Sequence, residues 1–292
     1  MNRLRHYSIL FKLLGLPSQL FINSVRFTDS EIKEALCSLK SLNNKSWSDT
    51  LCRVKSLYQQ LEDYEVLYPT HKEFPKSFYR LKQPPVFLTA VGNLQLLRHQ
   101  MVTVVGSRRP LVPFVDWMND HYVRFLKEND IVTVSGGAYG IDHLATQTAL
   151  FCGRSSLVIL PSGFHESYPR HTKKWLSDKS VLSLSEYFPK ETVRKHHFMT
   201  RNRLLGIISP HLLMVQCSVK SGTMTTVNAA LDSGVEVLVV PSFPNIIESH
   251  GNIQLLKDGA QVIATAEDLS LALGLFAPNP QCKNKENEIR NP

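Results

Sequence analysis

The chain has few of the features on which secreted, metal-binding and membrane proteins depend. Its five cysteines in 292 residues include no Cys-x-x-Cys spacing, which argues against a disulfide framework and against a zinc site. No uncharged stretch reaches the length of a membrane span, and Lys12 interrupts the apolar run near the N-terminus, which no small-residue cleavage site follows. We therefore expect a cytoplasmic protein that holds no metal and carries no secretory signal.

Familiar catalytic motifs are also absent from the sequence. The chain contains no GxSxG nucleophile turn, no HExxH metal motif and no Walker lysine, and Ser107 and Ser135 have no histidine at an informative spacing. Two carboxylates that follow predicted strands, Asp142 and Glu186, do not form a recognisable acid and base pair. The sequence therefore predicts neither an enzyme nor a bound cofactor.

Positive charge, by contrast, is plentiful and is concentrated in one part of the chain. The formal net charge is +8, and residues 163–220 hold ten Lys and Arg residues against four Asp and Glu residues. Such a basic segment favours a polyanionic partner, although a basic composition alone is also common among proteins that bind no nucleic acid.

The apolar residues divide the chain into regions of different texture. Residues 1–66 have apolar side chains at helical spacing and are predicted to form a small helical domain. Residues 67–276 alternate short Val, Ile and Leu runs with segments of helical length, a pattern typical of strands that helices cover on both faces. Residues 277–292 have almost nothing to bury, so we expect a disordered tail. The predicted fold class is α/β, with a doubly wound, mostly parallel sheet behind the helical domain.

Two glycine turns follow neighbouring strands of this predicted sheet. Gly106, Ser107 and Arg108 come directly after one buried run, and Gly136 and Gly137 come after the next. Because glycine permits backbone conformations in which N–H groups face an anion, and parallel strands end at one edge, both turns are expected at one crevice. The sequence therefore predicts an anion site, to which the Arg108 guanidinium adds a fork suited to phosphate.

Other polar and aromatic segments are expected at the same edge. The rings of Tyr139, Tyr168 or Phe198 are suited to stacking on an unpaired base. Lys173 and Lys174 lie either on a nucleic-acid path or on an ordinary solvated surface. The residues assigned to the site beyond the two turns are Asp142, Tyr168, Arg170, Lys173, Lys174, Arg201, Asn202, Arg203, Ser221 and Gly222.

Three of these assignments have a structural alternative. Asp142 stands at the predicted start of a helix, where a carboxylate also accepts backbone N–H bonds instead of facing a ligand. Arg201 and Arg203 flank Asn202, so one of them has the alternative of facing solvent, and we expect at least one of the two in the site. Arg108 has the alternative of pairing with a carboxylate, but a cation directly after a strand-terminal Gly-Ser pair is more often a ligand group.

The order of these segments resembles the DNA-processing protein A family, also called DprA or Smf. The resemblance extends over about residues 68–265, and its motifs are Phe74-Pro75, Pro84-Pro85, Val105-Gly-Ser-Arg108, Ser135-Gly-Gly-Ala-Tyr-Gly-Ile-Asp142, Tyr168-Pro169, Ser185-Glu186, Arg201-Asn-Arg203, Ser221-Gly222, Val240-Pro241 and Asp258-Gly-Ala260. It implies an extended Rossmann-like domain behind a helical domain similar to a SAM domain. It also implies a homodimer that binds and protects single-stranded DNA and loads the RecA recombinase onto it during natural transformation.

The same resemblance assigns roles to the turns and marks where this chain diverges. It implies that Gly106, Ser107 and Arg108 contact phosphate, and that Gly136, Gly137, Asp142, Arg201, Asn202 and Arg203 complete the pocket. The chain departs from the family pattern at Thr146, where a His is usual, at Thr172 for Asn, at Gln216 for an acidic residue and at Ser242 for Gly. We also expect the winged helix that many members carry to be absent, so the chain is a divergent member.

A nucleotide-binding or nucleotide-cleaving protein of the same broad fold class is the alternative. Under this alternative the chain would resemble the phosphoribohydrolases, which have a Pro-Gly-Gly-x-Gly-Thr turn followed by a helix with a Glu. Here Ser221-Gly-Thr-Met-Thr-Thr226 is followed by Val227-Asn-Ala-Ala230 without a Glu. A purely structural scaffold would leave both glycine turns unexplained, so DNA binding ranks first, nucleotide binding second and a scaffold third.

Overall fold

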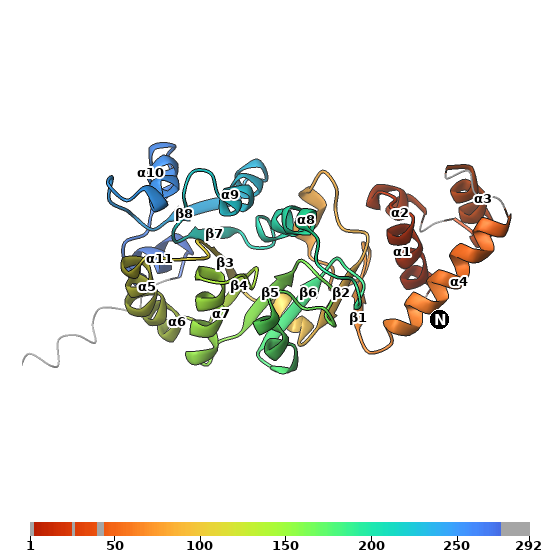
Figure 1. Ribbon diagram of the computed structural model, residues 1–292, viewed down its shortest axis with the longest axis horizontal. Coiled ribbons are helices and arrows are strands. Elements are labelled where there is room, and N and C mark those ends of the chain that lie inside the picture. Colours follow the sequence, from red (N-terminus) through yellow and green to blue (C-terminus); the bar gives the residue numbers. More distant parts are fainter. Residues whose placement is uncertain (1–2, 25–26, 40–43, 276–292) are drawn as a thin grey trace, which may run out of the picture.

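The computed structural model of the protein describes residues 3–24, 27–39 and 44–275, and the predicted tail 277–292 lies outside these ranges. The centre of the described part is a nine-stranded sheet with the order β1-β2-β6-β5-β4-β3-β7-β8-β9 (Figure 1). The strands are β1 (Glu65–Leu67), β2 (Leu88–Val91), β3 (Met101–Val105), β4 (Val132–Ser135), β5 (Ser156–Leu160), β6 (Val181–Ser185), β7 (His211–Met214), β8 (Glu236–Val239) and β9 (Gln261–Val262).

Most of this sheet is parallel. The strands from β6 through β9 in that spatial order run parallel, whereas β1 and β2 join one edge in antiparallel pairings. The predicted α/β class with a doubly wound, mostly parallel sheet is therefore confirmed. The winding changes direction at β3, which pairs with β4 on one side and with β7 on the other. Ligands of such sheets bind outside the carboxyl ends of the strands at this switch point.

Helices cover both faces of the sheet because alternate residues of each strand point to opposite sides. Val102 and Val104 of β3 point to one face, and Met101 and Val105 point to the other. The first face is covered by α5 (Val112–Trp117), α6 (Val123–Glu128), α7 (Ile141–Phe151) and α11 (Ala266–Ala272), and the second by α8 (Lys195–Leu205), α9 (Gly222–Asp232) and α10 (His250–Lys257).

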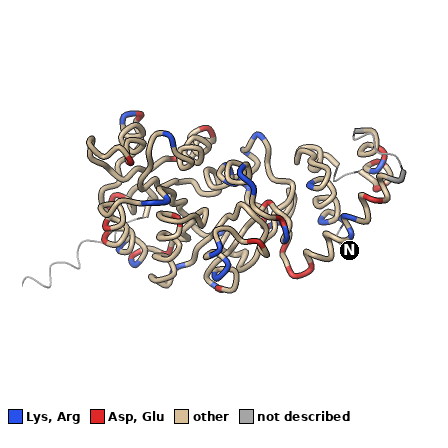
Figure 2. The backbone as a smooth tube through the Cα atoms, in the orientation of Figure 1, with Lys and Arg blue, Asp and Glu red and all other residues tan. Residues whose placement is uncertain are grey.

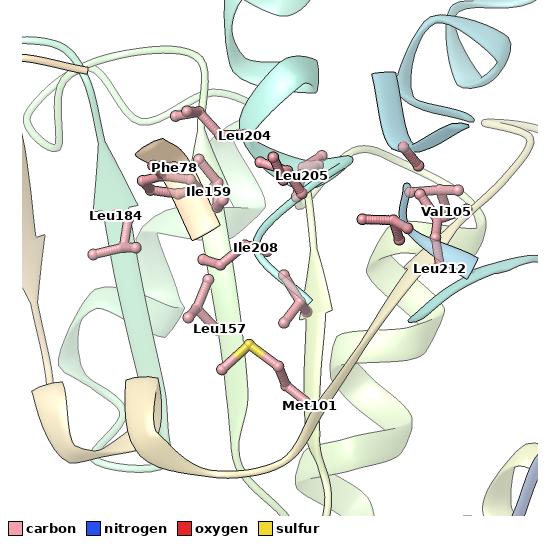
Figure 3. Close-up of a cluster of buried hydrophobic side chains, with 14 of the residues drawn as sticks. Phe78, Met101, Val105, Leu157, Ile159, Leu184, Leu204, Leu205, Ile208 and Leu212 are labelled. Carbon is pink, nitrogen blue, oxygen red and sulfur yellow. The ribbon is translucent and has the colours of Figure 1, made fainter. Parts of the chain in front are cut away.

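Two adjacent leucines fix α8 against the sheet. Leu204 and Leu205 lie in one buried cluster with Val105 of β3 and Ile159 of β5 (Figure 3). Because the preceding turn of the helix carries Arg201, this packing determines where that guanidinium stands relative to the strand ends.

The N-terminal helices pack at the β1 edge of the sheet. They are α1 (Arg3–Leu13), α2 (Ser18–Ser24), α3 (Asp29–Leu39) and α4 (Asn44–Gln60). Phe11, Phe21 and Val54 belong to a cluster that continues into Tyr68 and Phe87 beside the first two strands. This shared cluster joins the helices to the sheet. The division of the chain into a helical domain and a sheet domain therefore stays a prediction from the sequence.

Short helical turns connect the longer elements, and one of them, Arg170–Ser177, lies in the basic segment 163–220. These turns are η1 (Lys76–Arg80), η2 (Leu94–Arg98), η3 (Met118–Tyr122), η4 (Arg170–Ser177) and η5 (Ile247–Ser249). Figure 2 shows Lys and Arg on η4 and on α8, which follow β5 and β6 in the chain. Among the helices of the described ranges, none has the length and apolar character needed to cross a bilayer.

Candidate anion-binding site

The loops after β3 and β4 pack directly against each other. Ile141 donates its backbone N–H to the carbonyl oxygen of Ser107 at 3.0 Å. Gly140 has a φ of 77°, and a Cβ at this position would overlap the backbone of Ser107 and Arg108. A glycine is therefore required here both for the left-handed backbone and for the close approach of the two loops.

A groove of about 470 Å³ opens beside these loops, between the ends of β3 and β7. Of the predicted site residues, it brings together Gly106, Ser107, Arg108, Asp142, Arg201, Asn202, Ser221 and Gly222. A smaller pocket is lined by Arg108, Gly136, Tyr139, Tyr168, Phe198 and Arg201. Because Arg108 and Arg201 line both, the two cavities adjoin, and we call them together the crevice.

Several predicted site residues lie outside the crevice. Arg170 and Lys173 line a separate cavity of about 410 Å³, which adjoins the crevice at Tyr168. Lys174 lines a different cavity beside Trp175. All of these segments follow strand ends, as predicted. The carboxyl edge of the sheet extends beyond the crevice, however, so a residue at this edge does not always line it.

Arg108 and Arg109 are exposed where they line the groove. Within the described residues, no carboxylate lies at ion-pair distance from either guanidinium. The guanidinium carbon of Arg108 lies 5.4 Å from the centre of the Phe198 ring, and Tyr168 packs edge-on against that ring with centroids 5.7 Å apart. This aromatic support orients Arg108 and leaves its N–H donors for an incoming anion.

The backbone N–H groups of the glycine turns have partners within the protein. Asp142 accepts from Gly136 at 3.1 Å, and the N–H group of Gly106 also faces its carboxylate. Gly137 donates to the hydroxyl of Ser135 at 3.1 Å. The expectation that these N–H groups face a bound anion is therefore wrong, because buried donors need acceptors and nearby side chains supply them. Of the two roles predicted for Asp142, the structure shows the one in which its carboxylate accepts a backbone N–H bond.

Arg201 is buried and bonded to the protein itself. It donates to the carbonyl oxygens of Gly136 and Ile159, the latter at 2.8 Å, and to the side-chain oxygen of Asn202 at 3.1 Å. Burial lowers the pKa of Arg201 to about 10, and the nearby Asp142 carboxylate opposes this shift. Arg201 thus lines the crevice, with its Nε and Nη1 donors already engaged within the protein.

Arg203 is engaged on a different side of the same helix. One of its guanidinium nitrogens lies 2.6 Å from each carboxylate oxygen of Glu186, and the other donates to the carbonyl oxygen of Gln83 at 2.7 Å. Arg203 lines neither cavity of the crevice. Its contacts tie α8 to the segments that follow β6 and precede β2.

Two features of the site were not predicted from the sequence. Thr223 donates its hydroxyl to the carbonyl oxygen of Gly106 at 3.0 Å, which joins α9 to the first turn, and its place beside Ser221-Gly222 was an available signal. His143 and His171 pack with ring centroids 4.2 Å apart, and Nε2 of His171 lies 3.0 Å from the carbonyl oxygen of Gly137. No sequence signal links these two histidines, because they belong to different elements.

Comparison with known proteins identifies relatives over most of the chain. The family model for DNA recombination-mediator protein A matches residues 65–274. The chain is similar to DNA processing protein DprA of Bacillus subtilis, with 30% identity over 223 residues that cover 75% of this chain and 74% of that protein. It is similar to the DprA protein of Streptococcus pneumoniae, with 31% identity over 201 residues that cover 67% of this chain and 70% of that protein.

Two solved structures share the architecture. The X-ray structure of DprA from Streptococcus pneumoniae has a TM-score of 0.78 at 24% identity, covers 93% of this chain and 98% of its own, and shows the common fold. The structure of DNA processing protein A from Helicobacter pylori, which concerns the single-stranded DNA binding mode of that protein, has a TM-score of 0.64 at 31% identity. The match covers 73% of this chain and 97% of that chain.

Proposed function

Because the chain belongs to the DNA recombination-mediator protein A family, we propose that it binds single-stranded DNA in the crevice at the carboxyl edge of its sheet. The observation that carries the proposal is the setting of Arg108, which is exposed, seated on the Phe198 ring, and free of any carboxylate partner within the described residues. A guanidinium so placed donates two parallel hydrogen bonds to a phosphate. The 31% identical Helicobacter pylori protein, with its single-stranded DNA binding mode, supports the same class of ligand.

Bases and phosphates would meet different parts of the crevice. The rings of Tyr168 and Phe198 offer surfaces on which unpaired bases stack, whereas the bases of a duplex already stack on one another. Arg170 and Lys173 line the cavity on the other side of Tyr168 and extend the positive charge. The strand would run from that cavity over Tyr168 to Arg108 and into the groove beside β3.

The far wall of the groove suits a second phosphate. Ser221 caps the first turn of α9, since its hydroxyl accepts the backbone N–H of Met224, and Gly222 is exposed to the groove. The N-terminal end of a helix favours negative charge. We assign Ser107, Ser221 and Gly222 to this part of the strand path, while Lys174 and Arg203 lie off it.

A binding titration with a fluorescent oligonucleotide tests the proposed function. We expect the single strand to bind more tightly than a duplex of equal length, with little sequence preference. The logarithm of the affinity should fall with the logarithm of the salt concentration by about 0.7 for each phosphate contacted. A salt-independent affinity, or a preference for duplex, would contradict the proposal.

We further propose that a homodimer of this chain protects incoming DNA and delivers it to the RecA recombinase in natural transformation. The description of the family as a recombination mediator and the name DNA processing protein of the relatives support this role. Co-precipitation of purified RecA with the oligonucleotide complex, and sedimentation of the protein alone, test the two parts. A chain that stays monomeric, or a complex that never retains RecA, would count against them.

No catalytic step belongs to this proposal. The nucleotide-cleaving alternative requires release of free base from nucleoside monophosphates, and the turn at Ser221 lacks the following Glu that such chemistry would use. Incubation with nucleoside monophosphates and chromatography of the products is expected to show no free base. Base release that disappears in Ser221→Ala would favour the alternative instead.

A further inference from the structure

We propose that Asp142 and Arg201 are positioning residues, which hold the loops after β3 and β4 in the geometry that binds DNA without touching the strand themselves. The proposal rests on the proposed function. It gives a new role to two side chains that line the crevice and make their hydrogen bonds with other groups of the protein.

The Asp142 carboxylate joins the two loops. It stands in the first turn of α7 and is 6% exposed. It accepts the N–H group of Gly136 from the β4 loop at 3.1 Å, and the N–H groups of Ala138 and, from the β3 loop, Gly106 also face it. One side chain therefore fixes the ends of two neighbouring strands relative to each other.

Arg201 reaches the same loop from the opposite face of the sheet. Its side chain is 4% exposed, and Nη1 donates both to Gly136 and, at 2.8 Å, to Ile159 at the end of β5. Gly136 thus has its N–H held by Asp142 and its carbonyl held by Arg201. A Cβ on Gly136 would overlap both side chains, so only glycine fits between them. The ends of β3, β4 and β5 are tied together by this arrangement.

The two charges offset each other inside the protein. Burial raises the pKa of Asp142, while the Arg201 guanidinium and the backbone N–H donors act in the opposite direction. The guanidinium and the N–H donors favour the charged form of the carboxylate and so offset part of the cost of its burial. With both groups charged the pair adds no net charge to the crevice, and attraction of phosphate is left to Arg108 and Arg109.

One substitution is expected to change the affinity for DNA in opposite directions under a charge effect and under a positioning role. Asp142→Asn removes a negative charge and leaves Arg201 unopposed, so an effect of charge alone predicts tighter binding of DNA. The asparagine also presents an NH₂ group where the carboxylate accepted hydrogen bonds, which disturbs the loops. A positioning role therefore predicts weaker binding, the opposite of the charge effect.

Fluorescence anisotropy with one single-stranded oligonucleotide, repeated over a salt series, separates these outcomes. The proteins are the wild type, Asp142→Asn, Arg108→Ala and the double variant. We expect Asp142→Asn to weaken binding about tenfold with an unchanged salt slope, and the double variant to lose less than the two single losses combined, because both act through one loop. The matched control is Glu186→Gln, which alters a buried carboxylate bonded to the other arginine of α8 and should leave the affinity unchanged.

The possible results distinguish the inference from the function on which it rests. Binding by Asp142→Asn that equals or exceeds wild type would overturn the positioning role and leave DNA binding intact, whereas a wild type that binds no DNA would remove the proposed function. An equal loss in Glu186→Gln would reveal general destabilisation and also overturn the role. If a thermal melt followed by circular dichroism shows that Asp142→Asn is unfolded, Arg201→Lys replaces it, since it keeps the charge without the planar fork. Full affinity in that variant would equally overturn the proposal.

Discussion

The arginines of the β3 loop and those of α8 stand at one edge of the sheet and have opposite surroundings. Arg108 and Arg109 are exposed, and no carboxylate of the described residues pairs with them, whereas Arg201 and Arg203 are bonded to oxygen atoms of the protein. A guanidinium in water exchanges hydration for a phosphate at little cost, but a buried one is tolerated only with fixed partners. The position in the fold, and not the residue type, therefore separates the arginines that we propose bind DNA from those that hold the structure.

The largest loss of stability is expected when the negative charge near Arg201 is removed. Asp142→Ala is expected to lower the free energy of unfolding by about 3–5 kcal/mol, because it leaves a buried charge uncompensated. Urea unfolding of the variant and the wild type measures this difference. Arg109→Ala, an exposed side chain, is the control and should change the stability by less than about 0.5 kcal/mol. A loss below about 1 kcal/mol for Asp142→Ala would show that Arg201 does not depend on its buried partner.

Removal of the other arginine of α8, the partly buried Arg203, should separate stability from binding. Arg203→Met is expected to lower the free energy of unfolding by about 1–3 kcal/mol, because Glu186, which is 6% exposed, loses its charged hydrogen bonds. The affinity for a single-stranded oligonucleotide should not change. Urea unfolding and an oligonucleotide titration on the same preparation measure both quantities. A large loss of affinity with unchanged stability would place Arg203 on the DNA path.

The exposed arginine on the Phe198 ring should show the reverse behaviour. Arg108→Ala is expected to weaken single-strand binding by about ten- to a hundredfold, the effect of losing about 1.5–3 kcal/mol of charged hydrogen bonds. The thermal midpoint should stay nearly constant, and the salt slope should fall by about 0.7. Arg108→Lys should recover part of the affinity, since it keeps the charge and loses the fork. A lower thermal midpoint without loss of binding would assign Arg108 to the structural arginines.

The sequence predicts the place of the exposed Arg108 far better than it predicts the partners of Arg201 and Arg203. A glycine turn after a buried run is a local signal, and it correctly indicated the sheet, its carboxyl edge and the place of Arg108 in the crevice. The partners of Arg201 and Arg203 have no local signal. These residues are two positions apart on α8, and two helical steps turn a side chain through about 200°, so they face different surroundings. Only the packed fold brings Gly136 and Ile159 to one and Glu186 to the other.

A smaller effect is expected when the pH falls below the range in which histidine is neutral. Burial lowers the pKa of His143 to about 4, and it also lowers that of His171; each ring faces the other and Lys174. The unfolded chain binds protons at these positions near pH 6.5 while the folded chain resists them, so the free energy of unfolding should fall as the pH decreases from about 6.5 to about 4. Urea unfolding across this range, compared with His143→Gln, measures the contribution. Parallel profiles for the two proteins would show that His143 adds nothing.

The smallest effect is expected at Arg109, which shares the exposure of Arg108 and lacks its support. Its backbone N–H donates to the hydroxyl of Ser107 at 3.1 Å, and Pro110 restrains its backbone. Within the described residues no aromatic ring lies under its guanidinium, so binding a phosphate would cost it more side-chain entropy than it costs Arg108. Arg109→Ala should therefore weaken binding by less than about threefold, compared with Arg108→Ala in one buffer at one salt concentration. If Arg109→Ala is the more damaging variant, or if neither change is felt, exposure on the β3 loop does not identify the phosphate ligand, and the strand path must lie elsewhere along the edge.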